Sequence, residues 1–387
     1  MARKKKKNNK YYYAFVAIVL IIVILVAILD YNFRFGIVNW DEIFVSETES
    51  EKESQKVNVA GQIGNLTVTF IDVGQGDAIL INFPDGTNML VDAGENGSED
   101  ELEEHLIVNG EKLVLDYVVA THTDSDHIGA MDYVYENYTV KYSYRPYVKF
   151  SGAASFPDGF KNEGYNPKAS NTYKNYLNGV ANEGTENVFF TDSTDINVLV
   201  ETETETIEYK VDFVMPYAKT VEGFKDFNDS NDFSSVMIIE FAGRKIMLTG
   251  DMEKDAEAKF VDYYALNPEG VNLLDCDVLK VAHHGSATSS TSAFLDLIKP
   301  EHSVISCGVC HGTYMHPREE ALNNLIGVSS KIYRTDLQGT VTLVITPSGE
   351  MSFTTQTHEF DEYLLNSAEE LEQLNMKEEI KNFKTTL

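Results

Sequence analysis

The sequence has too few cysteines for a fold built on disulfides. Its 387 residues include three, Cys276, Cys307 and Cys310, whereas a disulfide framework pairs a larger, even set. At most one bridge can form, and one thiol is left over. The chain is long enough to bury a hydrophobic core instead, in one large domain or in two of ordinary size.

Basic residues are also scarce. The chain has 31 lysines and arginines against 61 aspartates and glutamates, a formal net charge of −30. Six of the basic residues precede Asp30, the first acidic residue, which leaves 25 basic against 61 acidic residues, or −36, from there on. Such a body repels polyanions at long range, so loose electrostatic binding of DNA is not expected. Activity on nucleic acid would need metal ions or a local basic track.

One uninterrupted apolar run stands out near the N-terminus. Residues 14–29 are sixteen apolar residues that follow three tyrosines. With the tyrosines they reach about the thickness of a hydrocarbon core, roughly 30 Å. We expect residues 1–10 to form a basic cytoplasmic tail and residues 11–30 a single transmembrane anchor, with the rest of the chain extracellular. A cleaved signal peptide is the alternative, although no small-x-small cleavage site follows Leu29.

The remainder divides into a tether, a folded domain and a tail. Residues 41–58 are rich in Glu, Ser, Thr, Lys and Gln, and we predict a solvated acidic tether over residues 31–64. Strand-like and helix-like segments alternate over residues 65–356, which we predict to be one domain. Residues 357–387 are predicted to form a helical tail.

Strand and helix patterns interleave in two halves of the domain, which predicts an α/β (α+β) fold of two sheets packed face to face with helices outside. The pattern is weak over residues 142–208. The predicted strands are residues 66–73, 78–83, 88–91, 117–120, 209–215, 235–241, 244–248, 276–282, 302–306, 331–333, 340–345 and 351–355. The predicted helices are residues 99–108, 128–136, 172–181, 253–266, 291–298 and 318–326.

Metal-ligand residues follow one of these strands directly. His122, Asp124, Asp126 and His127 lie within six positions after the apolar run 113–120. A strand that ends in such a turn is typical of a metal site, and the four side chains could serve one ion or two adjacent ions. The alternative is a solvated polar loop.

Two other predicted strands end in the same kinds of residue. Asp251 follows residues 244–248, and the pair His283 and His284 closes residues 276–282. Because strand ends on one edge of a sheet lie near each other, we expect these groups to converge with the first cluster. Their convergence would form a cation site from distant parts of the sequence.

Several motifs follow one another over residues 66–355. They are FIDVGQGDA at 70–78, VDAG at 91–94, HTDSDH at 122–127, LTGD at 248–251, LKVAHHGS at 279–286, HP at 316–317, and YRTD at 333–336 with Gly339. This ordered series resembles the metallo-β-lactamase superfamily, and within it the extracytoplasmic hydrolase domain of ComEC-type competence (DNA-uptake) proteins. The resemblance implies a four-layer αββα sandwich with the site at one edge of the sheets.

The resemblance also implies one or two divalent ions with a bridging hydroxide as nucleophile, since cations lower the pKa of bound water. His284 is the alternative to His283 as a ligand. The implied ligands are Asp126, His127 and His283 for one ion, His122 and Asp124 for the other, and Asp251 as the bridge.

The sequence departs from the commonest superfamily pattern at two points. Asp124 stands where a histidine is usual, and the histidine expected before the bridging aspartate is missing, with Asp232 in that region as a weak substitute. More oxygen ligands and fewer nitrogen ligands move the preference from zinc toward manganese. We therefore expect manganese or zinc, with one of the two sites weakened.

Further residues are assigned around the ions. Asp126, Asp251 and His316 are the predicted catalytic residues, and His316 could donate to a phosphate oxygen or a leaving group. The predicted supporting or substrate-contacting residues are Asp77, Asp92, Asp232, His284 and Ser286. Turn or helix capping is the alternative role for Asp77, Asp92 and Ser286.

The leading hypothesis is a membrane-anchored extracytoplasmic metal-dependent hydrolase, with phosphodiester bonds favoured and DNA as a possible substrate. A hydrolase of a small ester, lactone or thioester and a non-catalytic metal-containing binding module are the alternatives. Residues 307–311 (CGVCH) match the c-type haem attachment pattern. No haem is expected there, because a covalent haem would crowd the site. The sequence does not specify protein partners.

Overall fold

A computed structural model of the chain describes residues 54–164, 170–190, 195–215, 229–266, 274–308 and 315–357. The predicted tail 1–10, the anchor 11–30 and almost all of the helical tail 357–387 lie outside these ranges. Among the residues that are described, no helix combines the length and hydrophobicity that a membrane span requires.

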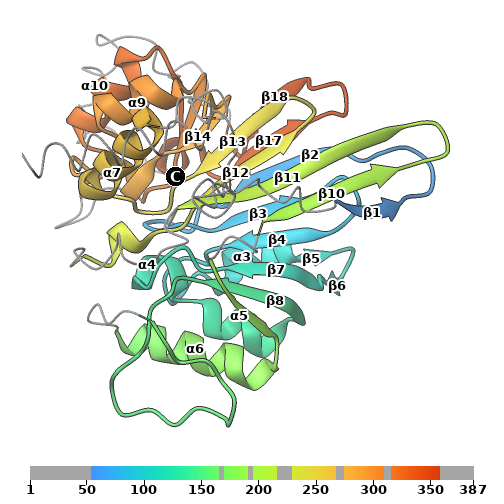
Figure 1. Ribbon diagram of the computed structural model, residues 1–387, viewed down its shortest axis with the longest axis vertical. Coiled ribbons are helices and arrows are strands. Elements are labelled where there is room, and N and C mark those ends of the chain that lie inside the picture. Colours follow the sequence, from blue (N-terminus) through green and yellow to red (C-terminus); the bar gives the residue numbers. More distant parts are fainter. Residues whose placement is uncertain are drawn as a thin grey trace, which may run out of the picture. The chain divides into compact units, whose positions relative to one another are not determined.

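Two eight-stranded sheets form the centre of the fold (Figure 1). Sheet A contains, in spatial order, β1 (Gln55–Asn58), β10 (Ile196–Glu201), β11 (Thr206–Met215), β12 (Val236–Phe241), β13 (Arg244–Leu248), β14 (Val278–Lys280), β15 (His302–Ile305) and β16 (Lys331–Arg334). Sheet B contains β18 (Met351–Thr355), β17 (Val341–Ile345), β2 (Leu66–Phe70), β3 (Ile79–Asn82), β4 (Asn88–Val91), β7 (Leu115–Val119), β8 (Val140–Arg145) and β9 (Glu186–Phe189). A separate two-stranded sheet pairs β5 (Ile107–Val108) with β6 (Glu111–Lys112).

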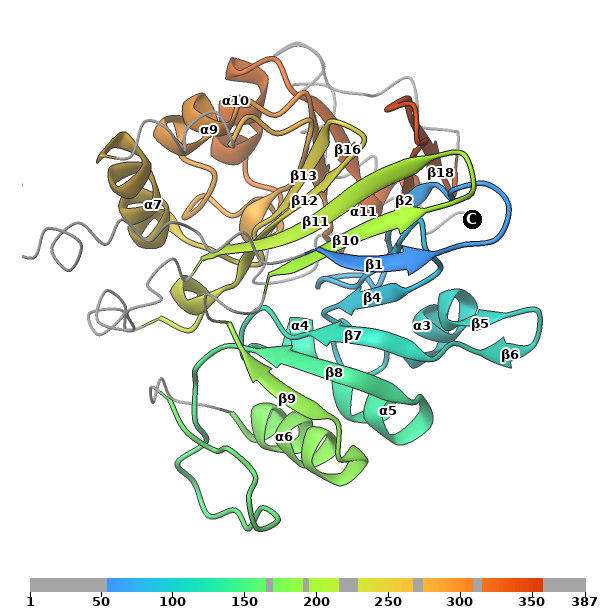
Figure 2. The same ribbon diagram turned by 45° about the vertical axis from the view of Figure 1, so that its right-hand side comes forward.

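Helices connect the strands and cover the outer faces of the sheets. Both views place α7, α9 and α10 together beside sheet A, and α3, α5 and α6 on the opposite side, beside sheet B (Figures 1 and 2). The α-helices are α3 (Glu99–Leu106), α4 (Ser125–Ile128), α5 (Met131–Asn137), α6 (Asn171–Glu183), α7 (Lys254–Leu266), α9 (Ser292–Ile298), α10 (Glu319–Gly327) and α11 (Thr335–Gln338). Short 3₁₀ turns are η2 (Asn231–Phe233) and η3 (Ala282–Gly285).

Each sheet has a parallel half. In sheet A, β13 to β16 are parallel neighbours joined through α7, α9 and α10. In sheet B, β4, β7, β8 and β9 are parallel neighbours. Because parallel strands point the same way, the carboxyl ends of each half meet at one edge of its sheet. That edge is where the sequence has its metal-ligand residues.

Both faces of the central strands are buried, which explains their nearly continuous apolar character. In β12, Met237, Ile239 and Phe241 pack between the sheets. Val236 and Ile238, which alternate with them, belong to the core under the helices. A strand with helices on one side and a second sheet on the other needs apolar residues at every position.

The predicted two-sheet sandwich with outer helices is confirmed. Three strands at the start of residues 142–208 or within them were not predicted individually: β8, β9 and β10. The predicted helix 128–136 is α4 followed by α5. β1 lies inside the predicted tether and pairs with β10 (Figure 2). Its residues are mostly exposed and polar, so they lack the alternation that indicates a strand.

Ile239→Ala is expected to lower the free energy of unfolding by about 2–5 kcal/mol, since it removes a fully buried side chain between the sheets. Chemical denaturation measures the change. Ser352→Ala, on an exposed position of β18, is the control and should change stability by less than about 0.5 kcal/mol. Equal effects of the two substitutions would contradict the placement of β12 in the core.

Candidate metal centre

Three strand ends bring the candidate ligands together. The turn after β7 in sheet B holds His122 to His127, while Asp251 follows β13 and His284 follows β14 in sheet A. Backbone hydrogen bonds join the loops: Ser235 N donates to Thr121 O at 2.9 Å, and His283 N donates to Gly250 O at 3.2 Å. The predicted convergence of distant segments is therefore present.

Four side chains form a close group: Asp126, His127, Asp251 and His284 each offer a ligand atom, all within 4.8 Å of one another. His127 Nε2 lies 3.0 Å from Asp251 Oδ1 and 3.3 Å from His284 Nε2. His284 Nε2 lies 3.2 Å from Asp126 Oδ2 and 3.4 Å from Asp251 Oδ2. Sheets A and B contribute two members each.

Two buried atoms at this point lack a hydrogen-bond partner among the described residues: Asp251 Oδ1 and His122 Nε2. Asp251 Oδ1 is close to His127 Nε2, but the pair does not have hydrogen-bond geometry. Leaving a buried acceptor unsatisfied costs about 1–3 kcal/mol. Four ligand atoms from two imidazoles and two carboxylates, all within 4.8 Å of one another, fit a divalent cation, so the residues present are suited to hold one.

Asp92 fixes the orientation of His127. Its Oδ2 accepts a hydrogen bond from His127 Nδ1 at 2.7 Å, and its Oδ1 accepts one from Thr121 N at 2.8 Å. With the proton held on Nδ1, the lone pair of His127 Nε2 faces the group. This carboxylate–histidine arrangement is the usual support of a metal-binding imidazole.

The same carboxylate also orients His122 through Thr121. The Thr121 hydroxyl donates to Asp92 Oδ2 at 2.7 Å, so its oxygen can accept from His122 Nδ1, 3.0 Å away. That leaves His122 Nε2 as an acceptor, 3.9 Å from Asp251 Oδ2. One buried aspartate thus sets the tautomer of both histidines in the turn.

His284 is oriented in the same way by a backbone carbonyl. Its Nδ1 donates to Ser306 O at 2.9 Å, which leaves Nε2 for the group. The turn η3 that presents it has φ of 48° at His283 and 53° at His284. Two successive left-handed residues are uncommon outside glycine, and here they turn the imidazole of His284 inward.

Burial and neighbouring charges act in opposite directions on these groups. Burial lowers the pKa of His127 and of His284, but the carboxylates around them, Asp251 first, outweigh it and raise each pKa well above 6.5. Burial raises the pKa of Asp251, and the adjacent His127 and His284 outweigh it and hold that pKa well below 3.8. For His122, burial and the charge of His127 lower the pKa.

Residues 71–309 match the metallo-beta-lactamase superfamily, and the strand-end group occupies that region. The chain belongs to the metallo-beta-lactamase superfamily. It is 28% identical over 290 residues to ComE operon protein 3 of Bacillus subtilis (strain 168), covering 71% of this chain and 32% of that protein. It is 36% identical over 111 residues to Competence protein ComA of Neisseria gonorrhoeae, covering 29% of this chain and 15% of that protein.

These similarities confirm the superfamily and the resemblance to competence proteins. The chain spans about a third or less of the length of these two relatives. Among solved structures, the metallo-beta-lactamase fold protein YhfI from Bacillus subtilis aligns with a TM-score of 0.40 and 12% identity, covering 75% of this chain and 100% of that chain.

His122 and Asp124, the ligands expected for a second ion, are not among the four residues whose ligand atoms come within 4.8 Å of one another. His122 is buried, with Nε2 3.9 Å from Asp251 Oδ2. Asp124 is partly buried, accepts a hydrogen bond from Ser230 Oγ at 2.6 Å and acts electrostatically on His122.

For the β14 ligand, the sequence predicts His283 and names His284 as the alternative, and the structure places His284 in the group. His283 Nε2 lies 3.8 Å from Asp251 Oδ2, and its Nδ1 lies 3.0 Å from Glu253 Oε1. The reason is local: the left-handed backbone of η3 decides which ring turns inward, and sequence spacing does not reveal it. His283 instead approaches the same carboxylate oxygen as His122.

Asp232 is placed as a helix cap. Its Oδ1 accepts a hydrogen bond from Ala256 N, in the first turn of α7, at 3.3 Å. Asp232 is not in the metal group. Burial raises its pKa to about 6, opposed by that hydrogen bond and assisted by Glu253 and Asp255. The predicted substitution of Asp232 for a missing histidine ligand finds no contact that supports it.

His316 and Ser286 lie at the margin of the centre. The His316 ring centroid is 5.4 Å from that of His283 and 6.3 Å from that of His284. Burial, followed by the charges of those two histidines, lowers the pKa of His316 to about 4. Ser286 Oγ lies 2.9 Å from Thr288 Oγ1 and accepts a hydrogen bond from Thr288 N at 3.3 Å, while the N-cap of α9 is Thr291.

Asp77 has a partner that the sequence analysis missed. Its Oδ2 lies 2.8 Å from Lys280 Nζ, and both side chains are almost fully buried. The sequence signal was a lysine at the end of a strand otherwise made of apolar residues. Gly76, with φ of 143°, allows this turn to pass the Asp126 backbone, since a Cβ there would collide with the carbonyl oxygen of Asp126.

Two other features, the thiol of Cys307 and a pocket, are not part of the close metal group. Cys307 is a buried free thiol, and Cys310 and His311 of the haem-like motif lie outside the described residues.

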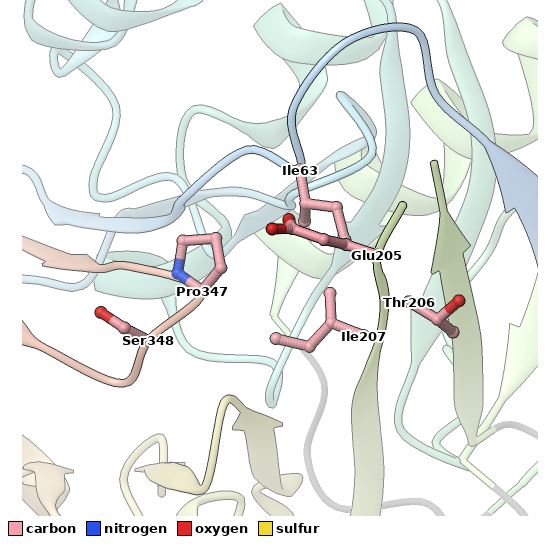
Figure 3. Close-up of a pocket in the computed structure, with 6 residues that line it drawn as sticks. All are labelled: Ile63, Glu205, Thr206, Ile207, Pro347 and Ser348. Carbon is pink, nitrogen blue, oxygen red and sulfur yellow. The ribbon is translucent and has the colours of Figure 1, made fainter. Parts of the chain in front are cut away.

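A pocket of about 540 Å³ is lined by residues such as Ile63, Thr206 and Pro347 (Figure 3). Thr206 begins β11, and Pro347 follows the end of β17 that pairs with the start of β2. The pocket is thus at the opposite end of the strands from the metal group.

Asp92→Asn is expected to weaken divalent-metal affinity about 10–100-fold. The amide still fits the left-handed backbone of Asp92 (φ 57°) but presents N–H to His127 Nδ1, which moves the ring proton to Nε2. Isothermal titration of the metal-free chain with Mn²⁺ or Zn²⁺ measures the Kd. Asp85→Asn, in the turn before β4 and bonded to Thr87, is the matched control; equal Kd values for the two variants would contradict the role of Asp92.

Asp232→Asn is expected to stabilise the protein increasingly as the pH rises. The folded state favours the neutral carboxyl of Asp232, because its pKa is raised from 3.8 to about 6. The native protein is therefore destabilised by ionisation of Asp232 as the pH rises from 3.8 to about 6, and asparagine, which does not ionise, avoids this loss. Denaturation on either side of pH 6 measures the trend. Asp262→Asn is the control, because Asp262 is an exposed residue of α7, the helix whose first turn Asp232 caps. A weaker metal Kd in Asp232→Asn would instead make Asp232 a ligand.

Proposed function

We propose that this chain is a metal-dependent hydrolase of phosphodiester bonds that acts outside the cytoplasm. The observation that carries the proposal is the close group of Asp126, His127, Asp251 and His284, with ligand atoms within 4.8 Å of one another. A divalent ion bound there would polarise the attacked group and lower the pKa of a bound water. Membership of a superfamily of metal-dependent hydrolases supports this reaction class.

The residues of the chain have distinct tasks in this proposal. Asp92 and the Ser306 carbonyl hold His127 and His284 with Nε2 toward the centre. Asp251 has both carboxylate oxygens in the group, one near His127 and the other near His284, His122 and His283. It is the residue best placed to serve two ions.

The ligand chemistry favours a hard cation. The close group combines two imidazoles with two carboxylates, and Asp124 stands where the commonest superfamily pattern has a histidine. Replacement of nitrogen ligands by oxygen ligands moves the preference from zinc toward manganese. We therefore propose manganese as the preferred ion, with one tightly held position and a second, weaker one near His122.

A phosphodiester substrate is supported by one positive side chain, Arg318, at the margin of the centre. Its charge lowers the pKa of His316, and its backbone N donates to the O of Gly285, the last residue of η3. Arginine recognises phosphate through its planar fork of donors. His316, neutral near pH 7 because its pKa is about 4, is proposed to hydrogen-bond the leaving oxygen.

DNA is the proposed natural substrate, because one of the similar proteins is named as a competence protein. The setting proposed for this activity is the outer surface of the membrane. The apolar run at residues 14–29, preceded by a lysine-rich segment, supports a single anchor over residues 11–30 with residues 1–10 in the cytoplasm.

A small ester, lactone or thioester is the second candidate substrate. The observation in its favour is charge: the chain from Asp30 onward carries −36, which opposes binding of a long polyanion. The same metal-activated water attacks carbonyl carbon as readily as phosphorus. Turnover on lactones and thioesters without turnover on phosphodiesters would replace the leading proposal with this one.

With Mn²⁺, the full-length chain is expected to hydrolyse a bis-aryl phosphodiester and single-stranded DNA. Asp251→Asn is expected to lower kcat/KM at least about a hundredfold, because losing the shared carboxylate removes several kcal/mol of metal-derived stabilisation of the transition state. Steady-state kinetics measure the change. Asp116→Asn, which removes a buried carboxylate paired with Lys141 at the distant end of β7, is the matched control.

Two outcomes would contradict the proposed function. Bound metal without turnover on any phosphodiester, ester or lactone would identify a binding module that uses metal for structure. Full activity of Asp251→Asn would remove the four-residue group from the reaction. A comparison of zinc-loaded and manganese-loaded chains tests the proposed choice of ion.

A further inference from the structure

Lys280 is a lysine buried inside the molecule directly behind the metal group. Its exposed fraction is 0%, and it belongs to the parallel strand β14. Its ammonium lies 2.8 Å from Asp77 Oδ2 and donates to Val281 O at 2.8 Å. Burying an ammonium costs several kcal/mol unless it is closely paired. The buried Lys280 ammonium therefore requires a close partner, and the position of that partner indicates what Lys280 does.

The pair links the two sheets at the edge that carries the ligands. Lys280 is in sheet A, four residues before His284, and Asp77 is in the sheet B turn between β2 and β3. Asp77 N also donates to Asp126 O at 3.1 Å. One residue, Asp77, is therefore bonded both to the backbone of a ligand from sheet B and to the strand that presents a ligand from sheet A.

A second cluster of ligand-type residues lies next to the metal group and shares His127 with it. Asp77, Asp92 and His127 offer ligand atoms that also lie within 4.8 Å of one another, and all three are buried. Two carboxylates this close repel each other unless a cation lies between or beside them. The Lys280 ammonium, on Asp77 Oδ2, is the cation that the chain itself supplies at this place.

The other oxygen of Asp77 faces the metal ligand. Asp77 Oδ1 lies 3.4 Å from His284 Nδ1 but makes no hydrogen bond with it; the Nδ1 hydrogen goes to the Ser306 carbonyl at 2.9 Å. The negative charge of Asp77 beside Nδ1 favours a proton on that nitrogen and leaves Nε2 for an ion. The Lys280 ammonium on Oδ2 keeps the Asp77 carboxylate at this place.

We propose that Lys280 is a positioning residue for the metal centre: its ammonium is an internal cation that holds Asp77, and through Asp77 supports the orientation and tautomer of His284. The inference rests on the metal site of the proposed function.

The test compares metal affinity with the stability of the metal-free chain. Lys280→Met leaves Asp77 buried without its cation, and it is expected both to destabilise the metal-free chain and to weaken the Kd for Mn²⁺ about 10–100-fold. The double variant Asp77→Asn/Lys280→Met removes both charges. It is expected to recover much of the lost stability while its Kd stays weak, because no cation fixes the amide beside His284.

Full-length variants are titrated with Mn²⁺ and with Zn²⁺ by calorimetry, and thermal unfolding is followed without metal. Ile239→Ala is the control for general destabilisation, since it lies between the sheets and outside the metal group. Lys141→Met, which breaks the Asp116–Lys141 ion pair, controls for loss of a lysine. Neither control is expected to change the Kd.

A native Kd in the double variant would overturn the proposal and leave the pair a purely structural link. So would a loss of affinity in Ile239→Ala equal to that in Lys280→Met. If Lys280→Met does not fold, the double variant alone decides. Absence of phosphodiester hydrolysis by the native chain would remove the proposed function but would not affect this comparison of dissociation constants.

Discussion

The arrangement of the strand ends depends on one electrostatic constraint: buried donor atoms of several side chains converge on a single point. Two imidazole nitrogens lie 3.3 Å apart there, with oxygens of Asp126 and Asp251 around them. Such a set is stable only if a cation, or protons held on the imidazoles, compensates the carboxylates. The hydrogen bonds of Asp92, Thr121 and Ser306 all serve this arrangement, since each holds a ring proton away from the point of convergence.

Much of this could be predicted from the sequence, because the relevant signals are local and strong. An apolar run followed at once by His122 to His127 favours a position for those side chains at a strand end, and the same holds for Asp251. Parallel pairing brings the ends together within each sheet, and the packing of the two sheets brings Asp251 to the turn after β7. The two-sheet sandwich follows from the same alternation of strands and helices. These inferences need the order of the elements along the chain but no knowledge of individual contacts.

Other features could not be decided from the sequence. His284, named from the sequence only as the alternative to His283, enters the close group because of the backbone of η3, which no periodicity encodes. β1 is a polar edge strand, and its pairing with β10 joins segments far apart in sequence. The sequence does not reveal that Lys280 is buried, because its partner Asp77 is also distant in sequence. For β1 and Lys280, tertiary contacts outweigh local propensity.

The division of the ligands between the two sheets has a consequence for how long the folded protein lasts. An ion held by Asp126 and His127 on one sheet and by Asp251 and His284 on the other would cross-link the two sheets. Its binding energy would add to the stability of the folded domain, by an amount that grows with the free ion concentration. Removal of the ion would then favour opening of the sandwich and expose its interior to proteases.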